Sequence, residues 1–300
     1  MSHGHSHPAF GTGRRFVVGI GLNLAIVGGE VAAALIGNST ALLADAGHNL
    51  TDVLSLVLAG GAVWLARRPA NSKRTYGFRR ATIMAALANA LLLIAISVVL
   101  AWECVEHLLA SRVVDEPLVI AVAAIAVVIN SATALLFMRG RKQDLNVRGA
   151  FLHMLSDAAL SVGVILAAIG ILLTGWQWLD PAMGLIIVLA ILWSTWSLLR
   201  DSFNLSLDAV PPGIDPKAIR AALLESPSIT EVHHLHVWAM STTEVALTAH
   251  LVKPDGQLDD ALLARLEQRL HERFDIRHVA LQLERGDTEA CPAGDIRTKT

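Results

Sequence analysis

Six apolar segments, separated by short polar stretches, dominate the first two thirds of the chain. They cover residues 16–36, 39–64, 81–102, 117–138, 150–173 and 181–199. A helix needs about 20 residues to cross the hydrocarbon core of a bilayer, and each segment is close to that length. The pattern therefore predicts a membrane all-α domain, a bundle of six transmembrane helices.

Lysine and arginine residues gather on one side of the predicted helices. That side holds Arg14, Arg15, Arg67, Arg68, Lys73, Arg74, Arg79, Arg80, Arg139, Arg141, Lys142, Arg148 and Arg200, whereas Arg112 alone lies on the other. Because positive residues mark cytoplasmic loops, both termini are predicted to be cytoplasmic in a multi-pass protein of the cell inner membrane. The short outer connections at 37–38 and 175–180 predict antiparallel hairpins.

The pattern after the sixth segment is that of a small α+β domain. Asp215 followed by Pro216 predicts the start of a helix that ends near Glu225. Alternating β-branched runs at 229–240 and 244–253 predict two strands, leucines at helical spacing predict a helix over 258–274, and 279–284 predicts a third strand. The expected order is α-β-β-α-β.

These patterns divide the chain into four predicted regions. Residues 1–13 form a flexible tail whose His3, His5 and His7 either bind metal loosely or have no role in transport. Residues 14–207 form the transmembrane domain, 208–285 the cytoplasmic domain and 286–300 a disordered tail. The start lacks the apolar core of a signal peptide, so no cleaved targeting peptide is expected.

Composition supports a membrane protein. Apolar residues make up 54% of the chain and charged residues 17%, where a soluble domain carries about 25% charged residues. The mean hydropathy is +0.53. A net charge of -2 does not indicate nucleic-acid binding, and no Walker-type loop predicts a nucleotide site. Cys104 and Cys291 show neither zinc-type spacing nor an evident disulfide.

A His-x-x-x-Asp motif occurs twice inside apolar segments. His48 and Asp52 lie in the second segment, and His153 and Asp157 lie in the fifth. Residues four apart share one face of a helix, so each segment presents an imidazole and a carboxylate together. Ionisable groups cost roughly 2.5 to 3.5 kcal/mol each at membrane depth, which makes four at matching spacing an unlikely accident.

Two facing motifs would supply two nitrogen and two oxygen ligands with a total charge of -2. That set neutralises a divalent ion and suits the tetrahedral preference of Zn²⁺. The alternative is a polar stripe that joins two helices by hydrogen bonds alone. The predicted boundaries place Asp52 near mid-membrane and His153 nearer the cytoplasmic end of its helix.

Asp45 extends the same stripe toward the outside, because it lies three residues before His48. Two interpretations stay open for it. Asp45 is either an accessory carboxylate for ion release or proton handling, or a charge near the membrane surface. Glu30, Asn23, Asn89 and Asn130 are interpreted as inter-helix hydrogen-bond partners rather than ligands.

Several motifs together resemble the cation diffusion facilitator family. They are the two HxxxD motifs, Tyr76-Gly77-Phe78-Arg79-Arg80, Asp180-Pro181, Val232-His233-His234-Leu235-His236-Val237-Trp238 and Gln282-Leu283-Glu284. The chain is most similar to the bacterial zinc, cadmium and cobalt efflux branch. The resemblance implies a homodimeric antiporter in membrane lipid that exports divalent ions in exchange for protons, with a ferredoxin-like cytoplasmic domain.

The resemblance also implies a cytoplasmic zinc site at His233, His250 and Glu284, so that Zn²⁺ would be both substrate and regulator. The predicted hairpin lets His233 and His250 face each other, with Glu284 on the neighbouring strand. The chain has His234 where many members have Asp, and Gln282 where some have His. Surface histidines without metal are the alternative, and His278 is a weaker candidate ligand.

By the same resemblance, Arg80 and Asp208 occupy the positions of a charge pair that links the membrane helices to the cytoplasmic domain. The alternative is two separate solvated charges, because exposed ion pairs contribute only about 0 to 1 kcal/mol.

Two other function classes compete with an antiporter. An intramembrane metallohydrolase would also place His and Asp on facing helices, but no His-Glu-x-x-His supplies a general base and four protein ligands leave no position for an activated water. A passive metal channel or a membrane metal sensor stays open on sequence.

Overall fold

The computed structural model describes residues 13–110, 112–138, 145–255, 257 and 259–286, with the backbone alone at 13–23, 136–137, 145–147 and 149–150. The predictions for the histidine tail, for Cys291 and for nearly all of the C-terminal tail lie outside the described residues. The described chain divides into two compact units, Met1–Val57 with Asn89–Trp196, and Leu58–Ala88 with Ser197–Thr300.

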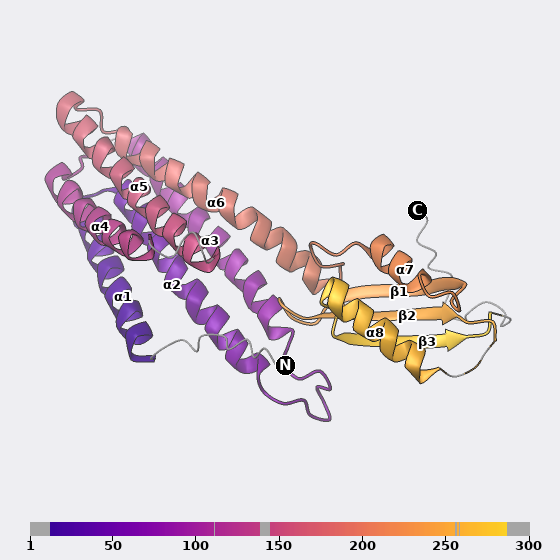
Figure 1. Cartoon of the computed structure of the whole chain (residues 1–300). Helices are drawn as coiled ribbons and strands as arrows, with labels where there is room; N and C mark the ends of the chain where they lie inside the picture. The colour runs from indigo at the N-terminus through magenta and orange to yellow at the C-terminus, as the bar shows by residue number, and fades with distance from the viewer. Residues whose placement is uncertain (1–12, 111, 139–144, 256, 258, 287–300) are drawn as a thin grey trace. The chain divides into compact units, whose positions relative to one another are not determined.

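Each predicted apolar segment forms a long helix (Figure 1). The helices are α1 (Gly13–Ile36), α2 (Thr40–Ala66), α3 (Ala81–Ala110), α4 (Glu116–Phe137), α5 (Leu145–Thr174) and α6 (Leu179–Ser206). Of the described helices, α2 to α6 are long and apolar enough to cross a membrane, and in α1 the shorter apolar stretch Leu24–Ile36 is described. The prediction of a helical transmembrane domain is confirmed.

The helix boundaries differ from the predicted ones where polar residues continue a helix beyond its apolar part. Helix α3 continues to Ala110 and α6 to Ser206, and α5 begins at Leu145 rather than at residue 150. His153 is the ninth of the 30 residues of α5, so it lies nearer the N-terminal end of this helix, as the predicted boundaries placed it, but further from that end than residue 150 as the first position implied. The turns at Asn38 (φ 50°) and Gly175 (φ 73°) use the left-handed region, which these residue types tolerate.

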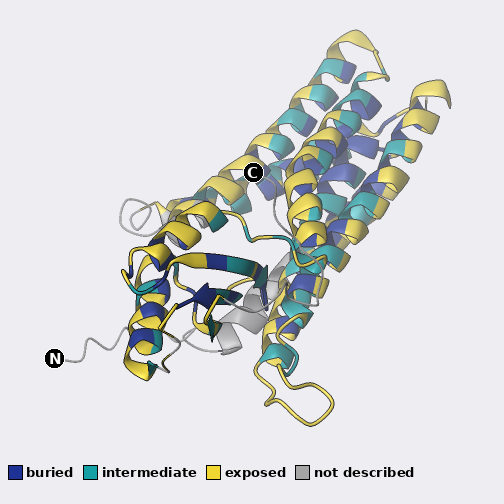
Figure 2. Ribbon diagram, turned by 90° about the vertical axis from the view of Figure 1, so that its right-hand side faces the viewer, coloured by how far each residue is buried: buried dark blue, intermediate teal, exposed yellow. Residues whose placement is uncertain are grey.

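Alanines and larger aliphatic residues together form the interior of the first unit, and large apolar residues also cover its exterior. The core includes Ala41, Ala44, Ala123 and Ala168, each at most 2% exposed, whereas Trp193 is 87% exposed. Figure 2 shows the exposed positions along the outer sides of the long helices. Small side chains let membrane helices approach closely, and exposed apolar side chains suit contact with lipid.

Asp180 connects the start of α6 to the start of α2. Its Oδ2 accepts hydrogen bonds from the backbone N–H of Thr40 at 2.6 Å and from the Thr40 hydroxyl at 2.8 Å, and its Oδ1 accepts one from the Ser39 hydroxyl at 2.5 Å. All three residues are buried. The first N–H groups of a helix have no partner within the helix, so Asp180 acts as a cap supplied by another helix.

Close packing reinforces this junction. A Cβ atom added at Gly184, one turn along α6, would lie 2.7 Å from the Cys104 sulfur of α3 and 3.1 Å from the Thr40 carbonyl oxygen. A side chain at this position would force the three helices apart. The N-terminal end of α2 is therefore fixed both by the Asp180 carboxylate and by the absence of a side chain at Gly184.

The C-terminal part of the second unit has the predicted α-β-β-α-β order. It consists of α7 (Pro216–Leu224), β1 (Glu231–Ala239), β2 (Val245–Val252), α8 (Asp260–Phe274) and β3 (His278–Glu284). The sheet order is β1-β2-β3, with β1 and β2 antiparallel and β2 and β3 parallel. This mixed three-stranded sheet confirms the predicted α+β domain, and Asp215 caps α7 as its sequence position predicted.

The two faces of this sheet have different characters. Helices α7 and α8 cover one face, where Ile219, Leu247, Leu251, Leu266 and Leu270 are buried in a common core. The opposite face carries the histidines of β1 and β2. Strand side chains alternate between faces, so burying one set of alternate positions necessarily presents the other set outward.

We predict that Asp180→Ala lowers the free energy of unfolding by roughly 3 kcal/mol, because it leaves buried donors of α2 without an acceptor. Thermal unfolding of the purified protein in detergent measures the effect. Asp201→Ala, which removes an exposed carboxylate from the same helix, is the matched control. Equal melting temperatures for the two variants would contradict the capping role.

Candidate metal centre

Helices α2 and α5 bring the two HxxxD motifs together in the first unit. The Nε2 atom of His48 lies 3.4 Å from Oδ1 of Asp157 and 4.0 Å from Oδ2 of Asp52. The Nε2 atom of His153 lies 3.3 Å from Oδ2 of Asp52 and 3.7 Å from Oδ2 of Asp157. Each imidazole thus contacts both carboxylates, so four nitrogen–oxygen contacts form a closed ring around one point.

The size of this ring fits a small tetrahedral ion. Ligand atoms about 2.0 Å from a central ion are separated by about 3.3 Å along the edges of a tetrahedron. The four nitrogen–oxygen distances, 3.3 to 4.0 Å, are equal to this value or longer, and the two contacts to Asp157 use different carboxylate oxygens. The two imidazoles do not contact each other directly, since their ring centroids are 6.2 Å apart in an edge-on arrangement. Binding of one ion by all four side chains would therefore require them to move closer together.

Exposure differs among the four side chains. Asp157 is 3% exposed and His48 17%, whereas Asp52 is 33% and His153 43% exposed. Ligand atoms of His48, Asp52 and Asp157 already lie within 4.8 Å of one another, and His153 contacts this group through both carboxylates. The cluster is therefore buried on the Asp157 side and more exposed on the His153 side.

Asp45 is fully buried and belongs to the same region. Its Oδ2 accepts a hydrogen bond of 2.7 Å from Ser161 of α5, one turn beyond Asp157. The Asp45 carboxylate is therefore enclosed between α2 and α5, and its role stays a prediction. Of the polar side-chain atoms in the described residues, three are buried without a hydrogen bond: Oε1 of Glu30, Oδ1 of Asp45 and Oδ1 of Asp157. Two of these oxygens belong to Asp45 and Asp157, and Oδ1 of Asp157 is also the atom that lies 3.4 Å from Nε2 of His48.

Two further polar residues at membrane depth act as inter-helix partners. Glu30 of α1 accepts a hydrogen bond of 3.0 Å from Asn49 of α2, and Asn89 of α3 accepts one of 2.9 Å from Ser55 of α2. Both were interpreted in this way from sequence. The Asn23 side chain lies outside the described part.

A second cluster lies on the histidine face of the sheet. The Glu284 carboxylate contacts Nε2 of His233 at 2.9 Å and Nδ1 of His250 at 2.6 Å. His233 and His250 are paired across β1 and β2, and Gln282 is the direct neighbour of His250 on β3. The three side chains are between 18% and 29% exposed, so the carboxylate holds two half-buried imidazoles in place. These residues are a second candidate metal site.

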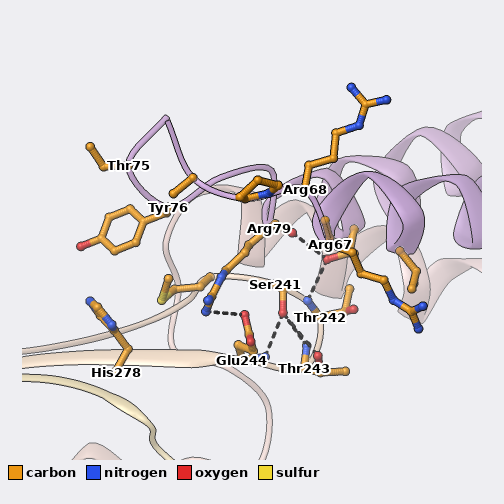
Figure 3. Close-up of a pocket in the computed structure, with 16 residues that line it drawn as sticks. Arg67, Arg68, Thr75, Tyr76, Arg79, Ser241, Thr242, Thr243, Glu244 and His278 are labelled. Carbon is orange, nitrogen blue, oxygen red and sulfur yellow. Dashed lines mark hydrogen bonds and ion pairs between the residues drawn. The ribbon is translucent and has the colours of Figure 1, made fainter. Parts of the chain in front are cut away.

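His278 does not join this cluster. It is the first residue of β3, opposite Ala246, four positions before Gln282. Its ring lies edge-on to the ring of Tyr76, with centroids 5.3 Å apart (Figure 3). Strand β3 begins at His278, one residue earlier than predicted. The His278 ring contacts Tyr76, which lies in the loop between α2 and α3.

That loop contacts the cytoplasmic ends of neighbouring elements within the second unit. Arg80 forms an ion pair with Asp208, and Arg79 contacts Glu244 at 2.8 Å. The Thr242 backbone N–H donates to the Thr82 hydroxyl at 3.1 Å. A hollow of about 650 Å³ is bordered by four of these residues, Arg79, Thr82, Thr242 and Glu244, and its wall also includes Arg67 and Arg68 (Figure 3). The side chains of both ion pairs are about half exposed. Exposed ion pairs contribute little to the free energy of unfolding, so the main effect of these two pairs is to hold the loop in position.

Sequence reasoning missed two polar groupings in the first unit. One is the cap that Asp180 provides for α2. In the sequence, Asp180-Pro181 was recognised only as one of the motifs of the family resemblance. The other lies at the end of α3, where Nε2 of the buried His107 is 3.2 Å from Glu103 and 3.0 Å from Arg112. The i,i+4 spacing of Glu103 and His107 was the available signal, and Arg112 had been interpreted only as a topology marker.

Comparison with known proteins agrees with this architecture. Residues 16–205 match the family model described as a cation efflux transmembrane domain. Residues 211–286 match the model described as the cytoplasmic domain of a cation efflux protein. Together the two matches span both the helical part and the sheet-containing part of the chain.

Individual bacterial relatives match over nearly the whole chain. The metal cation efflux system protein CzcD of Cupriavidus metallidurans is 36% identical over 97% of this chain and 92% of its own length. The zinc transporter ZitB of Escherichia coli is 35% identical over 95% and 93%. A cadmium, cobalt and zinc/H(+)-K(+) antiporter of Bacillus subtilis is 36% identical over 85% and 83%. The chain therefore belongs to the cation efflux, or cation diffusion facilitator, family, and it is a multi-pass membrane transporter with a cytoplasmic C-terminal domain rather than an enzyme.

Proposed function

We propose that this protein exports Zn²⁺, and with it Cd²⁺ or Co²⁺, from the cytoplasm across the cell inner membrane in exchange for protons. The ion would bind between His48, Asp52, His153 and Asp157. The observation that carries the proposal is the closed ring of four nitrogen–oxygen contacts between α2 and α5. The names of the related zinc transporter and antiporter support the same substrates.

The ligand set explains why a divalent ion of this class is favoured. Two carboxylates neutralise the charge of the ion, and imidazole nitrogen favours Zn²⁺, Co²⁺ and Cd²⁺ over the harder Mg²⁺ and Ca²⁺. In the low dielectric of a bilayer a charged ion needs this neutralisation, since an uncompensated charge there is costly. Loading the site therefore leaves it electrically neutral.

Proton coupling follows from the same ligands. An imidazole binds metal only in its neutral form, and its ordinary pKa near 6.5 lies close to cytoplasmic pH. Protons and the metal ion consequently compete for His48 and His153. If the site opens alternately to the two sides, protons entering from outside release the ion, and the protonated site exchanges them for a new ion inside. A proton gradient supplies about 1.4 kcal/mol per proton and pH unit.

The cytoplasmic domain would have a regulatory role in a homodimer. Glu284 already joins His233 to His250, and these three groups provide borderline and hard ligands at one place. They lie on the sheet rather than on the transmembrane helices. Zinc bound there would change the rate of transport without being the ion that is transported. The Arg80–Asp208 and Arg79–Glu244 ion pairs hold the loop between α2 and α3 against the same unit.

Zinc flux into sealed vesicles tests the proposal against a passive channel or a sensor. An antiporter moves zinc uphill only when a pH gradient is present, a channel never moves it uphill, and a sensor shows no flux. We predict that Asp157→Ala abolishes uphill flux, because it removes half of the neutralising charge. Ser156→Ala, at the neighbouring exposed position of α5, should keep parental flux. Unchanged flux in Asp157→Ala would refute the site.

We predict that His48→Asp relaxes metal selectivity. The change replaces a nitrogen ligand by a third carboxylate, and oxygen-rich sites impose tetrahedral geometry less strictly. The ratio of Zn²⁺ to Cd²⁺ transport should approach one, and the pH dependence of flux should move toward the lower pH range in which carboxylates titrate. Competition assays in vesicles at several pH values measure both. Zinc preference as strict as that of the parent would show that His48 does not select the ion.

We predict that the double change His233→Ala and His250→Ala weakens activation by cytoplasmic zinc but leaves a basal flux, since both residues lie outside the transmembrane cluster. Flux measured at graded zinc concentrations on the cytoplasmic side gives the activation curve. His271→Ala, at an exposed position of α8, is the control. An activation curve identical to that of the control would refute regulation at this site.

A further inference from the structure

The pairing of β1 with β2 is interrupted at the histidine cluster. His233 pairs with His250, whereas the next pair along the strands is His236 with Thr248. Two residues of β1, His234 and Leu235, therefore stand opposite the single residue Ala249 of β2. This arrangement is a β-bulge, in which one extra residue is inserted into one strand.

The extra residue is His234, as the burial pattern indicates. Val232, Leu235 and Val237 all pack toward the core shared with α7 and α8. Regular alternation from Val232 would place His234 on the core side and Leu235 outside. The bulge reverses that order, so Leu235 reaches the core and His234 stands beside His233 on the same outer face.

The backbone of His234 departs from strand geometry to achieve this. Its φ angle is 48°, in the left-handed region that is uncommon for residues other than glycine, although asparagine, aspartate and histidine adopt it more often than the rest. Such conformations persist where the surrounding structure requires them, and they concentrate at functional sites. A glycine would adopt this conformation without strain, yet the chain places an imidazole there.

The imidazoles of His233, His234 and His250 form a nearly regular triangle. Ring centroids are 5.3 Å apart for His233 and His234, 5.3 Å for His233 and His250, and 5.2 Å for His234 and His250. Three imidazoles bound tetrahedrally to one ion, each with a nitrogen about 2.0 Å from it, would have centroids about 5.2 Å apart. The triangle already has the size that a shared ion requires.

We propose that His234 is the fourth ligand of the cytoplasmic site. The site would then consist of three histidines and one glutamate from a single protomer. This assignment rests on the proposed regulatory function. Ligand atoms of His233, His250 and Glu284 lie within 4.8 Å of one another, and His234 is outside that group. Binding therefore requires the His234 ring to turn toward the other three while its backbone stays in place.

This donor set has a defined chemical preference. Three neutral imidazoles and one carboxylate favour borderline ions such as Zn²⁺ and Co²⁺ and disfavour Mg²⁺ and Ca²⁺, which take oxygen ligands. Four protein ligands fill a tetrahedral site completely, as in structural rather than catalytic zinc sites. The site would thus hold its ion firmly and pass nothing on to the transport pathway.

Co²⁺ binding to the full-length protein tests the assignment, because four-coordinate Co²⁺ absorbs visible light much more strongly than six-coordinate Co²⁺. The parent for the test carries Asp52→Ala and Asp157→Ala to disable the transmembrane cluster, and His3→Ala, His5→Ala and His7→Ala to remove the tail histidines. In this parent we compare His234→Asn, His234→Gly, His250→Ala and the control His271→Ala. Asparagine and glycine both tolerate the left-handed backbone, so both variants keep the bulge.

The expected result is one tightly bound Co²⁺ per protomer with strong visible absorption in the parent and in His271→Ala. His234→Asn and His234→Gly should weaken binding by about 10-fold or more and reduce the absorption, while their thermal unfolding without metal stays equal to that of the parent or improves. Parental affinity and spectrum in both His234 variants, with binding lost in His250→Ala, would overturn the assignment of His234 alone. Parental binding in His250→Ala would instead overturn the regulatory site itself.

Discussion

The cost of placing ionisable side chains at membrane depth is the constraint on which the helical unit depends. Each such group costs roughly 2.5 to 3.5 kcal/mol, and the four groups of α2 and α5 reduce that cost only when they meet. Their contacts of 3.3 to 4.0 Å require α2 and α5 to stay in one register. The Asp180 cap and the close packing at Gly184 fix the end of α2 and so serve that register.

The same constraint leaves some oxygens of the helical unit without full hydrogen bonding. Oε1 of Glu30 and Oδ1 of Asp45 are buried without a hydrogen bond, and Oδ1 of Asp157 has the 3.4 Å contact with Nε2 of His48. Buried oxygens of this kind are unfavourable unless a proton or a cation reaches them. An arrangement that paired every oxygen within the protein would be more stable.

In the cytoplasmic sheet, the alternation of side chains along a strand limits which polar residues can meet on the open face. A sheet covered on one face by α7 and α8 must alternate apolar and polar residues, and a metal site on its open face receives only every second residue. The bulge at His234 overcomes that limit by presenting two consecutive histidines on one face. The rigid pairing around it then holds the imidazoles at nearly equal separations.

The sequence by itself determined the helical segments, the order α-β-β-α-β and the two HxxxD motifs, because hydrophobic period and residue spacing are local properties. It also predicted that His233 faces His250, since the pairing of β1 and β2 follows from a short hairpin, whereas Glu284 on β3 was assigned to the same site by the family resemblance. Only the tertiary structure decided that α5 begins at Leu145, that Asp45 is buried against Ser161, that Asp180 caps α2 and that His234 lies in a bulge. The contacts of Asp45 and Asp180 depend on partners far away in the chain, and the bulge depends on a shift in strand register. The start of α5 depends on polar residues that continue the helix beyond its apolar part. None of these features leaves a periodic apolar signal in the sequence.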